Sequence, residues 1–145
     1  MNNRRAFSLV EIMVVTGIVV VLISLAVPNM LRSRVIGMET AALGNLRALN
    51  NACQLYQINR KSYPDSLPEL SEPRVTPPYI DPELATGSKQ GYQFVYSLES
   101  SDHFTVNANP LSSGLLRGRF FYMDESGQVH AKNGGAAGAD DPVLF

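Results

Sequence analysis

The chain has 145 residues, a formal net charge of −1 and one cysteine, Cys53. This length suits one domain together with an anchor, and a single cysteine excludes an internal disulfide. The balanced charge and the lack of a Lys/Arg-rich run argue against a nucleic-acid partner.

A long apolar stretch, Phe7 to Val27, lies near the N-terminus and is closed by Pro28. At about 1.5 Å per residue, a helix of this length spans roughly 31 Å, which is the thickness of the hydrocarbon core of a bilayer. Arg4 and Arg5 precede the stretch, so we expect this end on the cytoplasmic side and the bulk of the chain across the membrane. The sequence thus predicts a membrane-spanning helix.

Glu11 is the one charged residue inside this apolar stretch. A carboxylate in a membrane helix is unfavourable, and a plain anchor gains nothing from it, so Glu11 is a candidate functional residue that needs a partner. If the chain were cut after Ala6, the new α-amino group of Phe7 would be mostly cationic at neutral pH, because its pKa would be about 7.7–8.0. We expect Glu11 to pair with this amine, in its own chain or in an axial neighbour, and to set the register of packed helices.

The run RRAFSLVE, residues 4–11, resembles the processing site of type IV prepilins and type II secretion pseudopilins. The resemblance implies that a prepilin peptidase cuts between Ala6 and Phe7 and methylates the new amine, and that Glu11 serves subunit assembly at an inner-membrane platform. Pro28 stands where this family commonly places its first helix-kinking proline. Ala6 departs from the pattern, because the residue before the cut is normally glycine.

A secretory signal peptide is the alternative for the same segment. Basic residues precede an apolar run, and Ser24-Leu25-Ala26 resembles a small-x-small cleavage site. The apolar region of a signal peptide usually spans about 7–15 residues. This run is longer and carries Glu11, so we favour the prepilin interpretation.

A helical pattern continues beyond Pro28. Apolar residues recur at steps of three and four and predict one helix from about Phe7 to Ile58, whose second half packs on a globular head. Polar residues, Glu39 among them, fall off this stripe. Cys53 lies on the stripe, so we expect a buried structural thiol rather than a nucleophile. The stripe consists of Leu31, Val35, Met38, Ala42, Leu46, Leu49, Cys53 and Tyr56.

The remainder of the chain predicts a proline-rich loop and an antiparallel sheet. Six prolines between residues 64 and 82 exclude long regular structure, with room for one helical turn near Leu67, and residues 86–91 form a turn. Four alternating segments follow and predict a meander packed on the helix, which gives an α+β fold. The Gly/Ala-rich tail is expected to be flexible, with residues 143–145 docking back. The predicted strands are Tyr92–Tyr96, His103–Ala108, Arg119–Met123 and Gln128–Lys132.

Little in the sequence points to catalysis or to a cofactor. His103 and His130 are isolated on predicted strands and lack the spacing of a metal site or a catalytic constellation. Asp124, Ser126, Asp140 and Asp141 offer oxygens for calcium, but they lack EF-hand spacing, and we favour solvated turn carboxylates. We therefore expect no enzyme activity, no cofactor and no metal.

These features predict a structural protein in three parts: a leader at residues 1–6, a membrane and assembly helix at residues 7–29, and a pilin-like head at residues 30–145. The favoured hypothesis is a subunit of a type IV pilus-like filament, a helical homo-oligomer that is stored in the inner membrane and then becomes periplasmic or extracellular. The alternative within the family is a pseudopilin of a type II secretion system. A further alternative is a monomeric binding module, either anchored or secreted.

Overall fold

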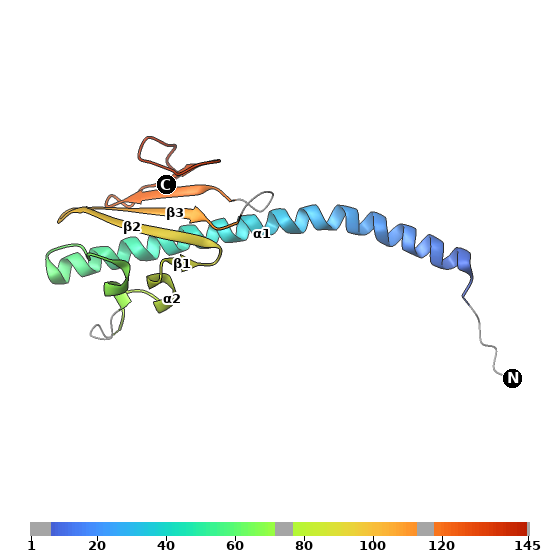
Figure 1. Ribbon diagram of the computed structural model, residues 1–145, viewed down its shortest axis with the longest axis horizontal. Helices are drawn as coiled ribbons and strands as arrows, with labels where there is room; N and C mark the ends of the chain where they lie inside the picture. Colours follow the sequence, from blue (N-terminus) through green and yellow to red (C-terminus); the bar gives the residue numbers. More distant parts are fainter. Residues whose placement is uncertain (1–6, 72–76, 113–117, 145) are drawn as a thin grey trace.

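The computed structural model describes residues 7–71, 77–112 and 118–144. One helix, α1 (Leu9–Arg60), runs through 52 residues and carries the rest of the fold on its second half (Figure 1). At about 1.5 Å per residue it is roughly 78 Å long. Its first half projects from the head, as the sequence predicts. The leader, including Ala6, lies outside the described residues.

Both ends of α1 and its passage through Pro28 have local causes. Ser8 has an extended backbone just before the helix, and Lys61 closes the helix with a left-handed backbone (φ 66°) whose N–H donates to the Gln57 carbonyl at 2.7 Å. Pro28 cannot donate a backbone hydrogen bond and crowds the preceding turn. The helix nevertheless continues and is bowed along its projecting part (Figure 1).

The sheet has five antiparallel strands in the order β1-β2-β3-β4-β5, in which each strand pairs with the next in the chain. This meander on a long helix confirms the predicted α+β class. The strands are β1 (Ser88–Lys89), β2 (Tyr92–Ser100), β3 (His103–Pro110), β4 (Phe120–Asp124) and β5 (Val129–Lys132).

The additional strand, β1, lies where the sequence predicts only a turn. Gln90 and Gly91 both have positive φ angles, 50° and 83°, and form the two-residue turn between β1 and β2. Glycine adopts this conformation without strain, and the turn pairs Lys89 with Tyr92. The predicted turn is therefore present, and it closes a short hairpin.

The core lies between α1 and the sheet. Tyr92 and Phe94 of β2, Phe104, Val106 and Ala108 of β3, and Phe121 and Met123 of β4 are buried at alternating positions, as the strand patterns predict. They meet Ala42, Leu46, Leu49 and Cys53 from the helix stripe, whose other members are half-buried. Burial of both apolar faces against each other holds the head on the helix.

The connection between helix and sheet contains two short helical turns. The 3₁₀ helix η1 (Leu67–Ser71) confirms the turn expected near Leu67. The helix α2 (Pro82–Ala85) was not predicted. Its local signal is Asp81, whose carboxylate accepts from the Glu83 N–H at 3.0 Å, followed by Pro82 at the first helical position.

The C-terminal tail has defined partners on β5. The Ala131 N–H donates to the Pro142 carbonyl at 3.0 Å, and the Leu144 N–H donates to the Val129 carbonyl at 2.7 Å. Val143 forms an antiparallel bridge with His130. Residues 143 and 144 therefore dock back as expected and, with Pro142, cover part of the outer edge of β5, while Phe145 lies outside the described residues.

Candidate functional site: the exposed apolar helix

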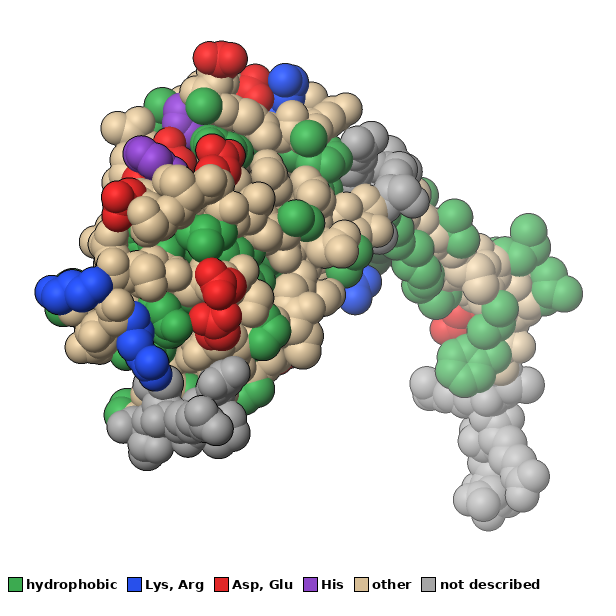
Figure 2. Space-filling model, turned by 60° about the vertical axis from the view of Figure 1, so that its left-hand side comes forward, with side chains coloured by type: hydrophobic (Ala, Val, Ile, Leu, Met, Phe, Trp, Pro, Cys, Tyr) green, Lys and Arg blue, Asp and Glu red, His purple; other side chains and the backbone are tan. Residues whose placement is uncertain are grey.

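The first half of α1 exposes its apolar side chains on every side. Fifteen large hydrophobic residues between Phe7 and Val27 are exposed, from 77% for Phe7 to 44% for Val19. The most apolar 18-residue window of the helix has a mean hydropathy of 2.7 and no buried residue, so the helix is long and apolar enough to cross a membrane. Hydrophobic side chains cover the projecting arm in Figure 2. An exposed apolar surface of this size needs either lipid or other apolar helices around it.

The uncharged polar residues of this segment bond to their own helix. The Thr16 hydroxyl donates to the Ile12 carbonyl at 2.9 Å, and the Ser24 hydroxyl donates to the Val21 carbonyl at 2.7 Å. The Asn29 side-chain amide donates to the Leu25 carbonyl at 3.1 Å. Such back-bonding satisfies a polar side chain in a medium without water. These residues are compatible with lipid and need no partner from outside.

Glu11 differs from these residues. It lies in the first turn of α1, where a carboxylate is favoured by the positive end of the helix dipole. Ser8 and Glu11 have the spacing of a capping box, but the Ser8 side chain makes no capping hydrogen bond. Within the described residues Glu11 has no hydrogen-bond or ion-pair partner. Its exposed carboxylate is thus available to another molecule.

The predicted site residues lie in different parts of the chain. Glu11 lies in the first turn of α1, whereas Phe7 precedes the helix, which begins at Leu9 after the extended Ser8. Ala6 lies outside the described residues. Pro28 is roughly 26 Å further along the helix than Glu11 and belongs to a different part of it.

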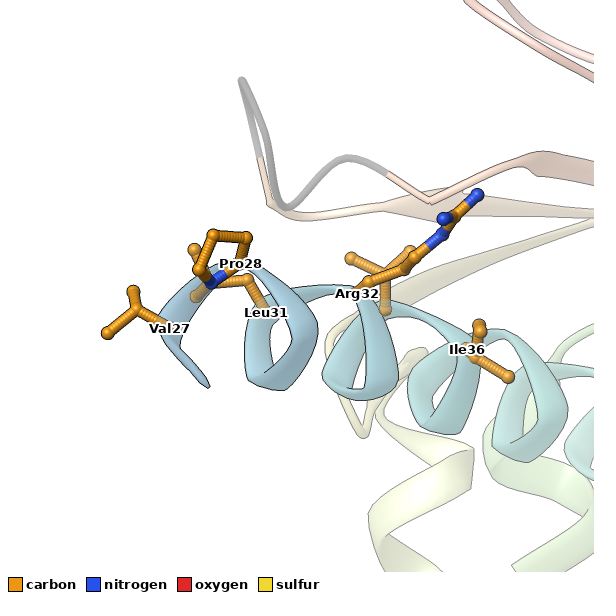
Figure 3. Close-up of a pocket in the computed structure, with 6 residues that line it drawn as sticks. Val27, Pro28, Leu31, Arg32 and Ile36 are labelled. Carbon is orange, nitrogen blue, oxygen red and sulfur yellow. The ribbon is translucent and has the colours of Figure 1, made fainter. Parts of the chain in front are cut away.

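A shallow groove follows Pro28. It has a volume of about 590 Å³, and the described residues that line it are Val27, Pro28, Leu31, Arg32, Val35 and Ile36. Figure 3 shows Val27 and Pro28 at its N-terminal end, Ile36 toward the head, and the Arg32 side chain extending away from the helix in the direction of the head. Apart from Arg32 this lining is apolar.

A polar cluster that the sequence analysis missed ties α1 to the beginning of β4. Oε1 of Glu39 accepts from the Arg119 backbone N–H at 2.9 Å, and Oε2 of Glu39 accepts from Nε of Arg119 at 3.0 Å and forms an ion pair with Nη2 at 3.0 Å. The Tyr92 hydroxyl donates to the Arg119 carbonyl at 2.9 Å, and burial raises the pKa of Tyr92. Glu39 lies beside the apolar stripe, so helical periodicity alone assigns it to solvent.

The oxygens considered for calcium lie in two separate places. Oδ1 of Asp124 accepts from the backbone N–H and the hydroxyl of Ser126 inside the β4–β5 turn. Asp141 accepts from the Gly138 N–H at 2.9 Å and pairs with Lys132 at the other end of β5. Among the described residues, no three His, Cys, Asp or Glu side chains come together as metal ligands do.

The two histidines also have structural contacts. His130 is buried, and its Nδ1 lies 2.6 Å from the Asp141 carbonyl oxygen. Nδ1 of the exposed His103 lies 2.6 Å from Oε1 of Glu125, and this hydrogen bond raises the pKa of His103. Each histidine thus connects two segments of the head.

Comparisons with known proteins show similarity at the N-terminus and over about three fifths of the chain. Residues 1–27 match the family model described as the prokaryotic N-terminal methylation motif. A chain with this motif, a long apolar helix and an antiparallel sheet has the organisation of a pilin-like protein. The match and the fold confirm the resemblance to the type IV pilin and type II secretion pseudopilin family.

The curated relatives share a more specific name than the family model. The chain is similar to "Type II secretion system core protein G" of Escherichia coli, with 36% identity over 91 residues, which cover 63% of this chain and 62% of the relative. It is similar to the proteins of the same name from Pectobacterium carotovorum, with 34% identity over 62% of this chain and 57% of the relative, and from Vibrio cholerae, with 34% identity over 63% and 62%.

The chain thus spans about 60% of the length of these relatives. No solved structure matches it. The relatives are named as core proteins of a secretion system and not as enzymes, which agrees with the expected absence of catalysis.

Proposed function

We propose that this chain is a pseudopilin, the structural subunit of a short filament in a type II secretion system. The names of its relatives support this alternative over the type IV pilus-like filament that we favoured from the sequence. In this proposal the chain is held in the inner membrane by residues 7–27 until a prepilin peptidase cuts between Ala6 and Phe7 and methylates the new amine. The head then lies on the periplasmic side.

The observation that carries the proposal is the exposed apolar helix with one carboxylate, Glu11, that has no partner among the described residues. Burial of a Leu, Ile, Val, Phe or Met side chain contributes about 1.5–3 kcal/mol. The fifteen exposed hydrophobic residues of this segment are therefore worth tens of kcal/mol when they leave water. A helix drawn out of lipid remains stable only where other apolar helices replace the lipid, so assembly exchanges bilayer burial for subunit packing.

Glu11 supplies the specificity of this packing. Apolar surfaces alone tolerate many relative positions, because the hydrophobic effect is non-directional. A carboxylate in an apolar bundle is stable only beside a positive group, and the Phe7 amine of a neighbouring subunit is the group that cleavage creates. Pairing of Glu11 with this amine fixes the axial offset between subunits.

The first experiment determines the N-terminal residue and mass of the protein recovered from native membranes and from sheared filaments. The proposal expects a chain that begins with methylated Phe7. A chain that begins at Val27 would show signal-peptide cleavage and leave a secreted binding module. An intact Met1 would mean that Ala6 blocks processing.

The second experiment tests Glu11 with a matched control on the head. Glu11→Ala should abolish or disorder filaments, while Glu99→Ala, which removes an equivalent charge from an exposed position on β2, should assemble normally. Electron microscopy and cross-linking between subunits report assembly, and the circular dichroism of the head reports folding. Normal filaments from Glu11→Ala would contradict the proposed pairing.

The pilus hypothesis and the secretion hypothesis predict different effects of deleting the chain. Deletion of the chain should stop the export of folded proteins to the medium if it serves secretion. Deletion should remove surface fibres and leave export intact if it builds a pilus. A chain that supports neither and remains monomeric in membranes would restore the binding-module alternative.

A further inference from the structure

Two arginines stand just beyond the apolar stretch. Arg32 and Arg34 are exposed, and within the described residues neither has a hydrogen-bond or ion-pair partner. At about 1.5 Å per residue, Arg32 lies roughly 8 Å and Arg34 roughly 11 Å beyond Val27 along the helix. The head-group layer on each side of a bilayer is about 5–8 Å thick. Long side chains from these two positions therefore reach the phosphates when residues 7–27 fill the hydrocarbon core.

The surface between the two arginines is apolar. On a helical wheel, Pro28, Leu31 and Val35 lie within about 60° of one another, and Arg32 and Arg34 flank them on either side. These apolar residues line the 590 Å³ groove with Val27 and Ile36. Met30 and Ile36 are also exposed, at 72% and 57%. The apolar surface of the helix thus continues past the predicted span into the layer where head groups and upper acyl chains lie.

The direction of Arg32 fits this layer. Its side chain leaves the helix in the direction of the head, so its guanidinium lies on the water side and its stem beside the apolar groove (Figure 3). An arginine at a membrane surface takes this orientation, because its stem stays in contact with apolar groups while its charge reaches the phosphates. A guanidinium donates two parallel hydrogen bonds to a phosphate.

We propose that Arg32 and Arg34, together with the groove from Val27 to Ile36, form a binding surface for anionic phospholipids in the leaflet that faces the head. The phosphates bind the two guanidinium groups, and the upper acyl chains fill the groove. Charge complementarity selects anionic over zwitterionic lipid, because the latter carries a positive group that opposes the arginines. This inference rests on the membrane-anchored state in the proposed function.

This lipid-binding surface would also fix how deeply the helix lies in the bilayer. A guanidinium bound to phosphate holds Arg32 in the head-group layer, so the span cannot slide toward the hydrocarbon core. Extraction of the subunit for assembly would require these contacts to break. The composition of the membrane would thereby set how readily the subunit leaves it.

The experiment uses the absence of tryptophan from the sequence. Met30→Trp places a single fluorophore at an exposed position one helical turn before Arg34. The full chain with this substitution is reconstituted into neutral phosphatidylcholine vesicles that contain a small fraction of brominated lipid, either phosphatidylglycerol or phosphatidylcholine. Bromine quenches tryptophan on contact, so the difference between the two reports which lipid surrounds residue 30.

The variants separate this surface from general charge. Each arginine near an anionic surface strengthens association about fivefold, and two strengthen it about thirtyfold. We expect brominated phosphatidylglycerol to quench preferentially, and Arg32→Gln with Arg34→Gln to remove the preference. Arg60→Gln with Lys61→Gln, which removes the same charge about 42 Å away along α1, should keep it.

Each other outcome overturns the inference. Equal quenching by the two lipids in the parent chain would show insertion without selectivity, so the lipid surface would be wrong while the proposed function stood. Selectivity that persists without Arg32 and Arg34 would assign it to other residues. No quenching by either lipid would show that the span is not in the bilayer and would overturn the membrane-anchored state as well.

Discussion

The contact of Glu39 with Arg119 allows the sharpest test of how the head is held on the helix. The Glu39 side chain is 14% exposed and the Arg119 side chain 37% exposed. Glu39 accepts two hydrogen bonds, at 2.9 Å from the Arg119 backbone N–H and at 3.0 Å from Nε of Arg119, and its Oε2 also forms an ion pair with Nη2 at 3.0 Å. Removal of one member of a fully buried ion pair costs about 3–5 kcal/mol. Because Arg119 retains contact with water, we expect Glu39→Ala to lower the free energy of unfolding by about 2–3 kcal/mol.

Two further substitutions and a double-mutant cycle test the same contact. Glu39→Gln keeps an oxygen that can accept from the Arg119 N–H but loses the charge, so we expect the free energy of unfolding to fall by about 1–2 kcal/mol. Glu99→Gln changes an exposed carboxylate and should lie within about 0.5 kcal/mol of the parent. A double-mutant cycle of Glu39→Ala with Arg119→Ala should give a coupling energy of about 1–3 kcal/mol.

The assay is urea unfolding of the full chain in detergent, followed by near-ultraviolet circular dichroism. All six tyrosines lie at residue 56 or later, so the signal reports on the head and not on the apolar helix. Two results would show that apolar packing between the helix stripe and the sheet is sufficient to hold the head. One is a free energy of unfolding for Glu39→Ala equal to that of Glu99→Gln, and the other is a coupling energy below about 0.5 kcal/mol. Either result would refute the assigned role of this contact.

Three further predictions concern the head. A Cβ at Gly118 would lie 2.3 Å from the Tyr92 hydroxyl, so Gly118→Ala should cost about 1–3 kcal/mol in the same urea assay, and an unchanged midpoint would contradict this packing. Burial raises the pKa of the Cys53 thiol to about 12, so a thiol reagent at pH 8 should label Cys53 only in urea; fast labelling of the folded chain would disprove its burial. The hydrogen bond with Glu125 raises the pKa of His103 above its unfolded value of about 6.5, so its stabilisation is complete below that pH and is lost as pH rises through the folded pKa. His103→Gln should remove this part of the pH dependence of unfolding, and an unchanged dependence would assign it elsewhere.

The sequence by itself determined the elements whose pattern is local. Apolar steps of three and four through Leu46, Leu49 and Cys53 predict the buried face of α1, and alternation through Phe104 and Val106 predicts the buried face of β3. Both predictions are confirmed, because side-chain periodicity decides which residues face a core. The apolar stretch and Glu11 were likewise visible, since a single charge in such a run has no local explanation.

Only the tertiary structure decided the contacts between segments that are far apart in the chain. Glu39 and Arg119 are 80 residues apart, and helical periodicity places Glu39 outside the buried stripe. Their contact exists because the sheet places the beginning of β4 beside the helix. Residues 133–141 are a similar case, because their composition predicts flexibility, whereas the Asp141 carbonyl oxygen lies 2.6 Å from Nδ1 of His130 on β5 and the Asp141 carboxylate accepts from the Gly138 N–H at 2.9 Å.

The same distinction applies to the candidate site. The sequence identified the apolar stretch and its carboxylate, because hydropathy and charge are properties of single residues. The structure added that Thr16, Ser24 and Asn29 satisfy themselves on their own helix, whereas Glu11 does not. Satisfaction of a polar group depends on where its neighbours lie in space, and composition does not contain that information.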